Sequence, residues 1–189
     1  MAELRNVQTV DAKKGLSTQD LILIAVLLAA GAVLKLTVAN FLSIGGCKAN
    51  FMIASYCLAI VLIRPKLGQA AIIGLITGLI SQIPLLNATP MVNIVSELVG
   101  AFVCGALVLA LCKSDKESMG KKVIIPAVIT FVATVCSGYS FSLIVGCVLN
   151  GLALGAVFAT YSIVVLPTAC MNAVFVAILT PLLKAALKK

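Results

Sequence analysis

Residues 123–183 form an unbroken stretch of 61 residues that contains no Asp, Glu, Lys or Arg. A membrane-spanning helix needs about 20 predominantly apolar residues, so this stretch is long enough for two or three crossings. In the whole chain of 189 residues, 62% are hydrophobic and only 11% are charged. A soluble domain could not cover so much apolar surface with so few polar groups. The sequence therefore predicts an integral membrane protein and excludes a soluble enzyme or a disordered chain.

Four further apolar runs precede this stretch, and the basic residues between them indicate the topology. The runs cover residues 21–39, 49–63, 67–83 and 91–112. If the N-terminal tail is cytoplasmic, twelve of the fourteen basic residues lie inside, as the positive-inside rule requires. The last basic cluster is inside only when the final stretch crosses an even number of times. We therefore expect an all-α membrane protein with six transmembrane helices and cytoplasmic termini, built as a cytoplasmic tail (1–20) and a six-helix membrane domain (21–189).

Two crossings do not use all the apolar residues of the final stretch. We expect an irregular, protein-packed outer connection over residues 150–162, near Gly146, Gly151 and Gly155. Irregular backbone is tolerated in a membrane where it is buried in protein or lines a cavity. The connection is therefore a candidate lid over an outer site.

Missing residue types exclude several chemistries. The chain has no histidine, which removes Ser-His catalysis and most transition-metal sites. Its seven cysteines include no Cys-x-x-Cys pair, and no phosphate-binding Gly-x-x-x-x-Gly-Lys-Ser/Thr loop is present. We therefore expect no enzyme, no metal and no cofactor. The net charge of +8 follows from the positive-inside distribution, which favours contact with membrane lipid and not nucleic acid.

Two charged residues lie inside predicted spans, Lys35 near the outer end of the first and Glu97 near the outer end of the fourth. Charged groups are costly in a bilayer and are therefore candidate functional groups. Further polar residues gather at the same outer side: Asn40, Lys48, Asn50, Gln82 and Asn93. This layout predicts a solute site open to the outside. The alternative is a Lys35–Glu97 ion pair that only holds two helices together.

The first apolar run also has a side of small residues. Ala25, Ala29 and Ala32 follow a spacing that lets another helix approach closely. The approaching helix belongs either to this chain or to a partner protein. Because Ala25 lies toward the cytoplasmic end, Ala25 and Ala29 are candidate partner-docking residues.

Short motifs along residues 21–183 carry a family resemblance. They are Leu23-Ile24-Ala25, Ala29 to Leu34, Lys48 to Met52, Ala59 to Leu62 with Pro65, Ile73-Gly74, Thr77-Gly78, Val92-Asn93-Ile94, Ala101-Phe102, Leu166-Pro167, Asn172 and Pro181. With six helices and an outer polar site, the chain resembles the substrate-binding S component of energy-coupling factor (ECF) transporters, and most closely their tryptophan-transporter branch. The resemblance implies uptake of a small nutrient, above all tryptophan, across a prokaryotic plasma membrane. It also implies a transmembrane coupling protein and two ATPase subunits as partners.

The resemblance suggests how a zwitterionic amino acid would bind. Glu97 would pair with the ammonium, and Lys35 or Lys48 would meet the carboxylate, with Asn93 adding to a helix start. Aromatic and sulfur-containing side chains would flank the indole: Phe41, Phe51, Met52, Tyr139 and Phe141. The alternatives are an S component for a vitamin such as riboflavin, thiamine or pantothenate, a stand-alone secondary carrier, and a subunit that binds no ligand.

Overall fold

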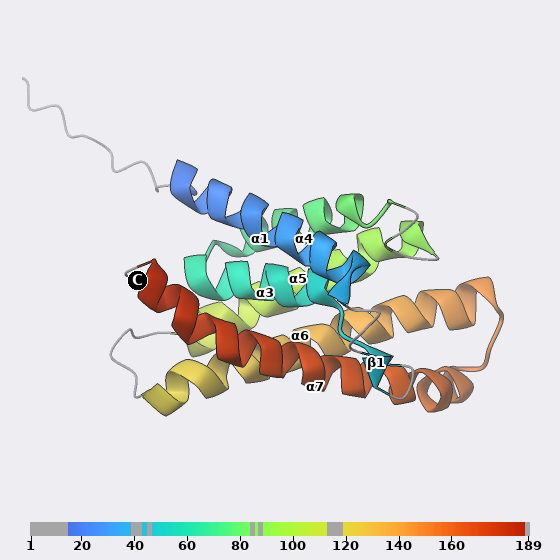
Figure 1. Ribbon diagram of the computed structural model, residues 1–189. Helices are drawn as coiled ribbons and strands as arrows, with labels where there is room; N and C mark the ends of the chain where they lie inside the picture. Colours follow the sequence, from blue (N-terminus) through green and yellow to red (C-terminus); the bar gives the residue numbers. More distant parts are fainter. Residues whose placement is uncertain are drawn as a thin grey trace, which may run out of the picture.

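The computed structural model describes residues 15–38, 43–44, 47–83, 86, 89–112 and 119–187, with the backbone alone at 43–44, 47–48 and 119–120. In these residues the helices are α1 (Thr18–Leu36), α3 (Phe51–Ile63), α4 (Leu67–Ile80), α5 (Pro90–Leu111), α6 (Met119–Leu143) and α7 (Leu154–Ala186), and the π-helical η1 (Ile144–Leu149) continues α6. A small antiparallel hairpin of β1 (Ser43–Ile44) and β2 (Cys47–Lys48) lies between α1 and α3. The predicted all-α fold is therefore confirmed, with one short hairpin added (Figure 1).

Four helical elements in the described part of the chain are long and apolar enough to cross a membrane. They are α1, α5, α6 together with η1, and α7. The other two, α3 and α4, have 13 and 14 residues. At 1.5 Å per residue each is about 20 Å long, against a hydrocarbon core of about 30 Å. The structure thus has an element at each predicted span, with two of them shorter than a full crossing.

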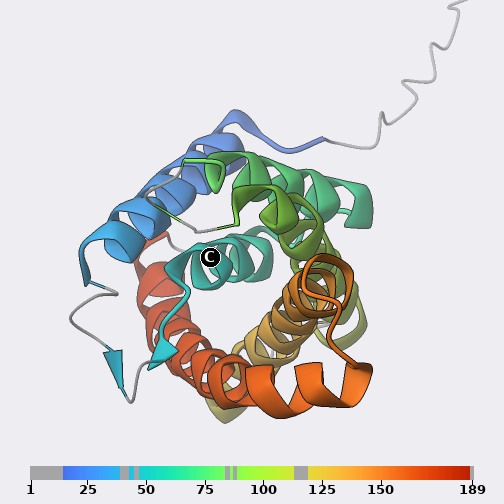
Figure 2. The same ribbon diagram turned by 90° about the vertical axis from the view of Figure 1, so that its right-hand side faces the viewer.

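The short helix α3 lies in the centre of the bundle, surrounded by the other helices (Figure 2). Every residue from Phe51 to Leu62 is buried. A helix that is apolar on all sides has to be buried, and α3 has no polar face to present to water. Because neighbouring helices shield it, α3 does not need the length of a lipid-facing span.

Local signals at the helix ends explain the boundaries. The Ser17 hydroxyl accepts the Asp20 backbone N–H at 3.2 Å and the Asp20 carboxylate accepts the Ser17 N–H at 3.2 Å, which is a capping box. Helix α1 therefore begins at Thr18, inside the tail predicted over 1–20. At the C-terminal end of α3, Arg64 adopts a left-handed conformation with φ 53°, and Pro65 follows it. This combination ends a helix sharply.

The expectation of an irregular connection over 150–162 is wrong beyond Ala153. Helix α6 continues through η1 to Leu149, and α7 already begins at Leu154. Residues 154–162 contain no proline or polar cluster that would stop a helix, so the apolar sequence continues as one. Gly151 alone in this region takes a positive φ, 65°, and it makes the turn. With 33 residues α7 is about 50 Å long, and the α6–α7 pair projects beyond the other helices (Figure 1).

Candidate functional site

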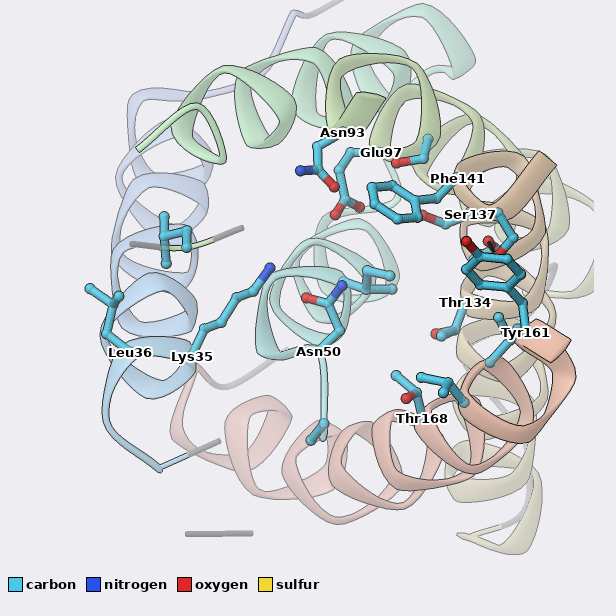
Figure 3. Close-up of a pocket in the computed structure, with 18 residues that line it drawn as sticks. Lys35, Leu36, Asn50, Asn93, Glu97, Thr134, Ser137, Phe141, Tyr161 and Thr168 are labelled. Carbon is cyan, nitrogen blue, oxygen red and sulfur yellow. Dashed lines mark hydrogen bonds between the residues drawn. The ribbon is translucent and has the colours of Figure 1, made fainter. Parts of the chain in front are cut away.

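A cavity of about 480 Å³ opens at the end of the bundle where α1 ends and where α3 and α5 begin (Figure 3). Its size is typical of a small-molecule site. The lining residues are Lys35, Leu36, Ala49, Asn50, Ile53, Leu86, Asn93, Ser96, Glu97, Thr134, Ser137, Gly138, Phe141, Ser142, Tyr161, Val164, Val165 and Thr168. Five helices therefore contribute to one cavity, which is lined by apolar side chains together with several polar and charged ones.

Glu97 is the most deeply placed charged group of the cavity. Its side chain is 1% exposed, and its Oε2 has no hydrogen-bond partner among the described residues. The hydroxyls of Tyr56 and Ser137 lie beside the carboxyl group, and the positive charge of Lys35 acts on it from α1. Figure 3 shows Lys35 and Glu97 both directed into the cavity. A buried carboxylate with an open acceptor atom is costly unless a cation or a donor meets it, so this site suits a ligand with a positive group.

Two asparagines stand at helix starts around the cavity. Asn50 precedes α3, and its Oδ1 is buried without a hydrogen-bond partner in the described part of the chain. Asn93, in the first turn of α5, is 3% exposed, and its Nδ2 donates to the Thr89 carbonyl at 3.4 Å. The N-terminal ends of α3 and α5 therefore both face the cavity, and both add positive potential to it.

The wall formed by α6 and α7 combines aromatic rings with hydroxyls. Phe141 and Tyr161 supply the rings, and the hydroxyls come from Thr134, Ser137, Ser142 and Thr168. Of these only Phe141 was expected from the sequence. A signal was present, because Thr130, Thr134, Ser137 and Phe141 recur at helical spacing in a stretch without charges. These hydroxyls give the apolar wall several places to hold a polar ligand.

Together with Phe141, four predicted polar or charged residues line this cavity: Lys35, Asn50, Asn93 and Glu97. Two others lie elsewhere. Tyr139 hydrogen-bonds Ser162 of α7 at 2.6 Å, and its ring packs on Phe158 with centroids 5.0 Å apart. The Gln82 Nε2 donates to the carbonyls of Gly78 and Pro90, at 2.8 and 2.9 Å. These contacts join α6 to α7 and the end of α4 to α5.

The remaining predicted residues of this site are placed as follows. Phe51 and Met52 are buried in the bundle, and the Phe51 ring packs edge-on against Phe175 with centroids 5.1 Å apart. Asn40 and Phe41 lie outside the described residues, as does the side chain of Lys48.

A second, apolar groove of about 490 Å³ runs along the outside of the bundle between α1 and α4. Ala25 and Ala29, the predicted docking residues, are exposed and line it. Its other lining residues are Leu16, Leu21, Ile24, Leu28, Gln69, Ile72, Ile73, Ile76 and Ile80. Ala25 and Ala29 therefore face outward, whereas Gly31 of the same helix is buried against Phe51 and Ser55 of α3.

Apart from Lys35, the basic side chains that the structure describes lie at the end of the bundle opposite the cavity. Arg64 and Lys66 lie between α3 and α4, Lys121 lies in the first turn of α6 and Lys184 is in the last turn of α7. The end of α7 also lies at this end in Figure 1. The distribution of charge expected from the positive-inside rule is thus present in three dimensions.

Apolar helical elements around a cavity that holds one buried acidic and one basic side chain define a membrane protein of the solute-transport class. The chain belongs to the tryptophan transporter TrpP family, which it matches over residues 17–188. It is also 31% identical over 175 residues to a probable tryptophan transport protein of Bacillus subtilis (strain 168), covering 92% of this chain and 95% of that protein. No solved structure matches the chain.

Family membership confirms the resemblance to the tryptophan-transporter branch. The chain is thus a component for tryptophan uptake, a multi-pass protein of the cell membrane, and a member of a family of transporters and not of enzymes.

Proposed function

We propose that the cavity binds tryptophan as a zwitterion, with its ammonium on Glu97 and its carboxylate near Lys35. The observation that carries this proposal is the buried Glu97 carboxylate, whose Oε2 has an open acceptor position in the same cavity as Lys35. A free amino acid carries one positive and one negative group, so it complements both side chains at once. Charge-assisted hydrogen bonds of this kind are about twice as strong as neutral ones.

The indole lies in this proposal against the α6–α7 wall. Phe141 and Tyr161 offer ring faces on that side of the cavity, away from Lys35 (Figure 3). Aromatic pairs add about 0.5–1.5 kcal/mol beyond the burial of their surface. The unpartnered Oδ1 of Asn50 is a further acceptor for one of the ligand's N–H groups.

The proposed topology has both termini in the cytoplasm and the cavity open to the outside. It is supported by Arg64, Lys66, Lys121 and Lys184, which all lie at the end of the bundle opposite the cavity. A binding site that faces outward suits capture of a nutrient before uptake.

Transport itself is proposed to need partners, as in ECF transporters: a transmembrane coupling protein and two ATPase subunits. The groove between α1 and α4 supports this part of the proposal, because Ala25 and Ala29 present a smooth, exposed surface there. Small residues let two membrane helices approach closely. A stand-alone carrier is the competing mechanism, and it would move tryptophan in liposomes that contain this protein alone.

The experiment that tests the ligand is thermal unfolding of the purified protein with tryptophan, tyrosine, phenylalanine, riboflavin, thiamine and pantothenate in parallel. A ligand at about 100 times its Kd adds about 2.7 kcal/mol to the free energy of unfolding. We expect tryptophan to raise the Tm and the other five compounds to leave it unchanged. If one vitamin raised the Tm and tryptophan did not, that vitamin would be the substrate. If none of the compounds raised the Tm, the proposal that the cavity binds a ligand would be contradicted.

A further inference from the structure

Asn172, in the middle of α7, connects two walls of the cavity without facing it. Its side chain is completely buried. Its Oδ1 accepts the backbone N–H of Asn50 at 3.1 Å, and its Nδ2 donates to Thr134 Oγ1 at 3.3 Å. A backbone N–H is always a donor, so the oxygen of the Asn172 amide has to face Asn50. The amide nitrogen then has to face Thr134.

This arrangement makes the Thr134 hydroxyl oxygen the acceptor in its contact with Asn172. Because Thr134 Oγ1 accepts a hydrogen bond from Asn172, its own proton remains available for donation. Other hydroxyls of these helices use their protons differently: Ser142 donates to the Gly138 carbonyl at 2.8 Å and Thr180 to the Val176 carbonyl at 2.6 Å. Thr134 lines the cavity, so it offers a donor there.

The chemistry of the ligand decides what this donor meets. The ammonium and the indole N–H of tryptophan are both donors, and its carboxylate is its acceptor group. A hydroxyl that has its proton to give therefore matches the carboxylate. The acceptors Glu97 Oε2 and Asn50 Oδ1 match the two N–H groups.

We propose that Asn172 is a positioning residue, which holds the Thr134 hydroxyl as a donor toward the carboxylate of the bound amino acid. This inference rests on the proposed function and deepens it, because it assigns a specificity for α-carboxylates to the contact between α6 and α7. Asn172 also holds the Asn50 backbone at the start of α3. One buried amide is therefore hydrogen-bonded to two cavity-lining residues, Asn50 and Thr134.

The test compares variants of Thr134 and Asn172 in the purified full-length protein. Thr134→Val removes the hydroxyl at nearly constant size, and Thr134→Ser keeps it. In Asn172→Asp both carboxylate oxygens are acceptors, so the Thr134 proton turns away from the cavity. A hydrogen bond to a charged group contributes about 1.5–3 kcal/mol, so we expect Thr134→Val and Asn172→Asp to weaken tryptophan binding by about tenfold or more. Thr134→Ser should stay within about threefold of the wild type.

Tryptamine, which lacks the carboxylate, separates this role from a structural one. We expect Thr134→Val to leave its affinity nearly unchanged, because the lost donor has no partner on that ligand. The proposal is overturned if Thr134→Val binds tryptophan as tightly as the wild type, or if Thr134→Ser loses as much tryptophan affinity as Thr134→Val. It is also overturned if Thr134→Val lowers the affinity for tryptamine as much as the affinity for tryptophan. Should Asn172→Asp fail to fold, the comparison of Thr134→Val with Thr134→Ser tests the proposal. Failure of the wild type to bind tryptophan would instead refute the proposed function.

Discussion

Lys35 of α1 and Glu97 of α5 line the same cavity, and the Glu97 Oε2 has no hydrogen-bond partner among the described residues. An ion pair that served only to hold two helices together would occupy the acceptor atoms of the carboxylate. The open position is what a binding site for a cationic group needs. The relationship between these two residues therefore favours a ligand clamp over a purely structural pair.

Replacing Glu97 by Gln should abolish the positive-group site while preserving the shape of the cavity. We expect tryptophan affinity to fall by about tenfold or more, since a charge-assisted hydrogen bond is lost. The Tm of the ligand-free protein should not fall, because the variant no longer buries a charge. Isothermal titration calorimetry measures the first effect and thermal unfolding the second. Unchanged tryptophan affinity would show that Glu97 does not meet the ammonium.

Replacing Lys35 by Met should act on the other end of the ligand. The apolar stem is retained, but the carboxylate loses its positive partner, so tryptophan affinity should fall by about tenfold. Tryptamine has no carboxylate, and its affinity should be equal or higher, because a like charge near its ammonium is removed. Competition binding with both ligands measures the difference. Equal losses for the two ligands would assign Lys35 a structural role.

Tyr139→Phe should change stability more than binding. The Tyr139 hydroxyl bonds Ser162, whose own hydroxyl donates to the Phe158 carbonyl, and its ring lies outside the cavity lining. Loss of this bond should lower the free energy of unfolding by about 1 kcal/mol and leave tryptophan affinity within about twofold. Tyr161→Ala is the matched comparison inside the cavity and should weaken binding. A large loss of tryptophan affinity in Tyr139→Phe would show that Tyr139 belongs to the binding site.

Gly100→Ala should destabilise the protein. A Cβ at this position would meet the Tyr56 hydroxyl and would lie 2.8 Å from the Ser137 Cβ, so α5 would have to move away from α3 and α6. Overpacking of this kind costs about 1–3 kcal/mol. Gly68→Ala is the control, because Gly68 lies in α4 with nothing within 4 Å of its Cβ position. It should be neutral or slightly stabilising. Equal Tm values for the two variants would contradict the close packing.

Bulky residues in the α1–α4 groove should separate binding from transport. Ala25→Leu and Ala29→Leu fill the groove without touching the cavity. We expect tryptophan binding to remain and uptake by cells to be lost, because a partner helix could no longer approach. Ala30→Leu is the control, since Ala30 is exposed on α1 but does not line the groove. Normal uptake in the groove variants would refute docking at this surface.

The sequence predicted the features that local chemistry determines. Apolar runs placed the helices to within a few residues, and the lone charges Lys35 and Glu97 identified the cavity because charges are rare inside spans. The connection after Leu149 is shorter than predicted, since Gly151 makes the turn but Gly155 does not stop a helix in an apolar stretch. Gly155 lies in the first turn of α7. A glycine is compatible with a turn or with a helix start, so its residue type alone did not show where α7 begins.

Contacts between distant segments could not be predicted. Asn172 and Asn50 are separated by 122 residues, and their hydrogen bond depends on α7 passing beside the start of α3. Tyr139 shows the same limit. It was expected to flank the indole together with Phe141, but the rotation of α6 turns it toward Ser162. Helix rotation about its axis follows from packing, and a charge-free helix gives little signal for it.

The most direct test uses the fact that this chain contains no tryptophan. All indole fluorescence in a mixture with the wild-type protein therefore comes from the ligand. Titration of the purified protein into tryptophan should give a saturable blue shift and a rise in anisotropy at one ligand per chain, because the indole moves from water into a cavity lined by Phe141 and Tyr161. Glu97→Gln should lose most of this signal at the same concentrations. Unchanged fluorescence with folded wild-type protein, or an equal response from Glu97→Gln, would contradict a tryptophan site built around Lys35 and Glu97.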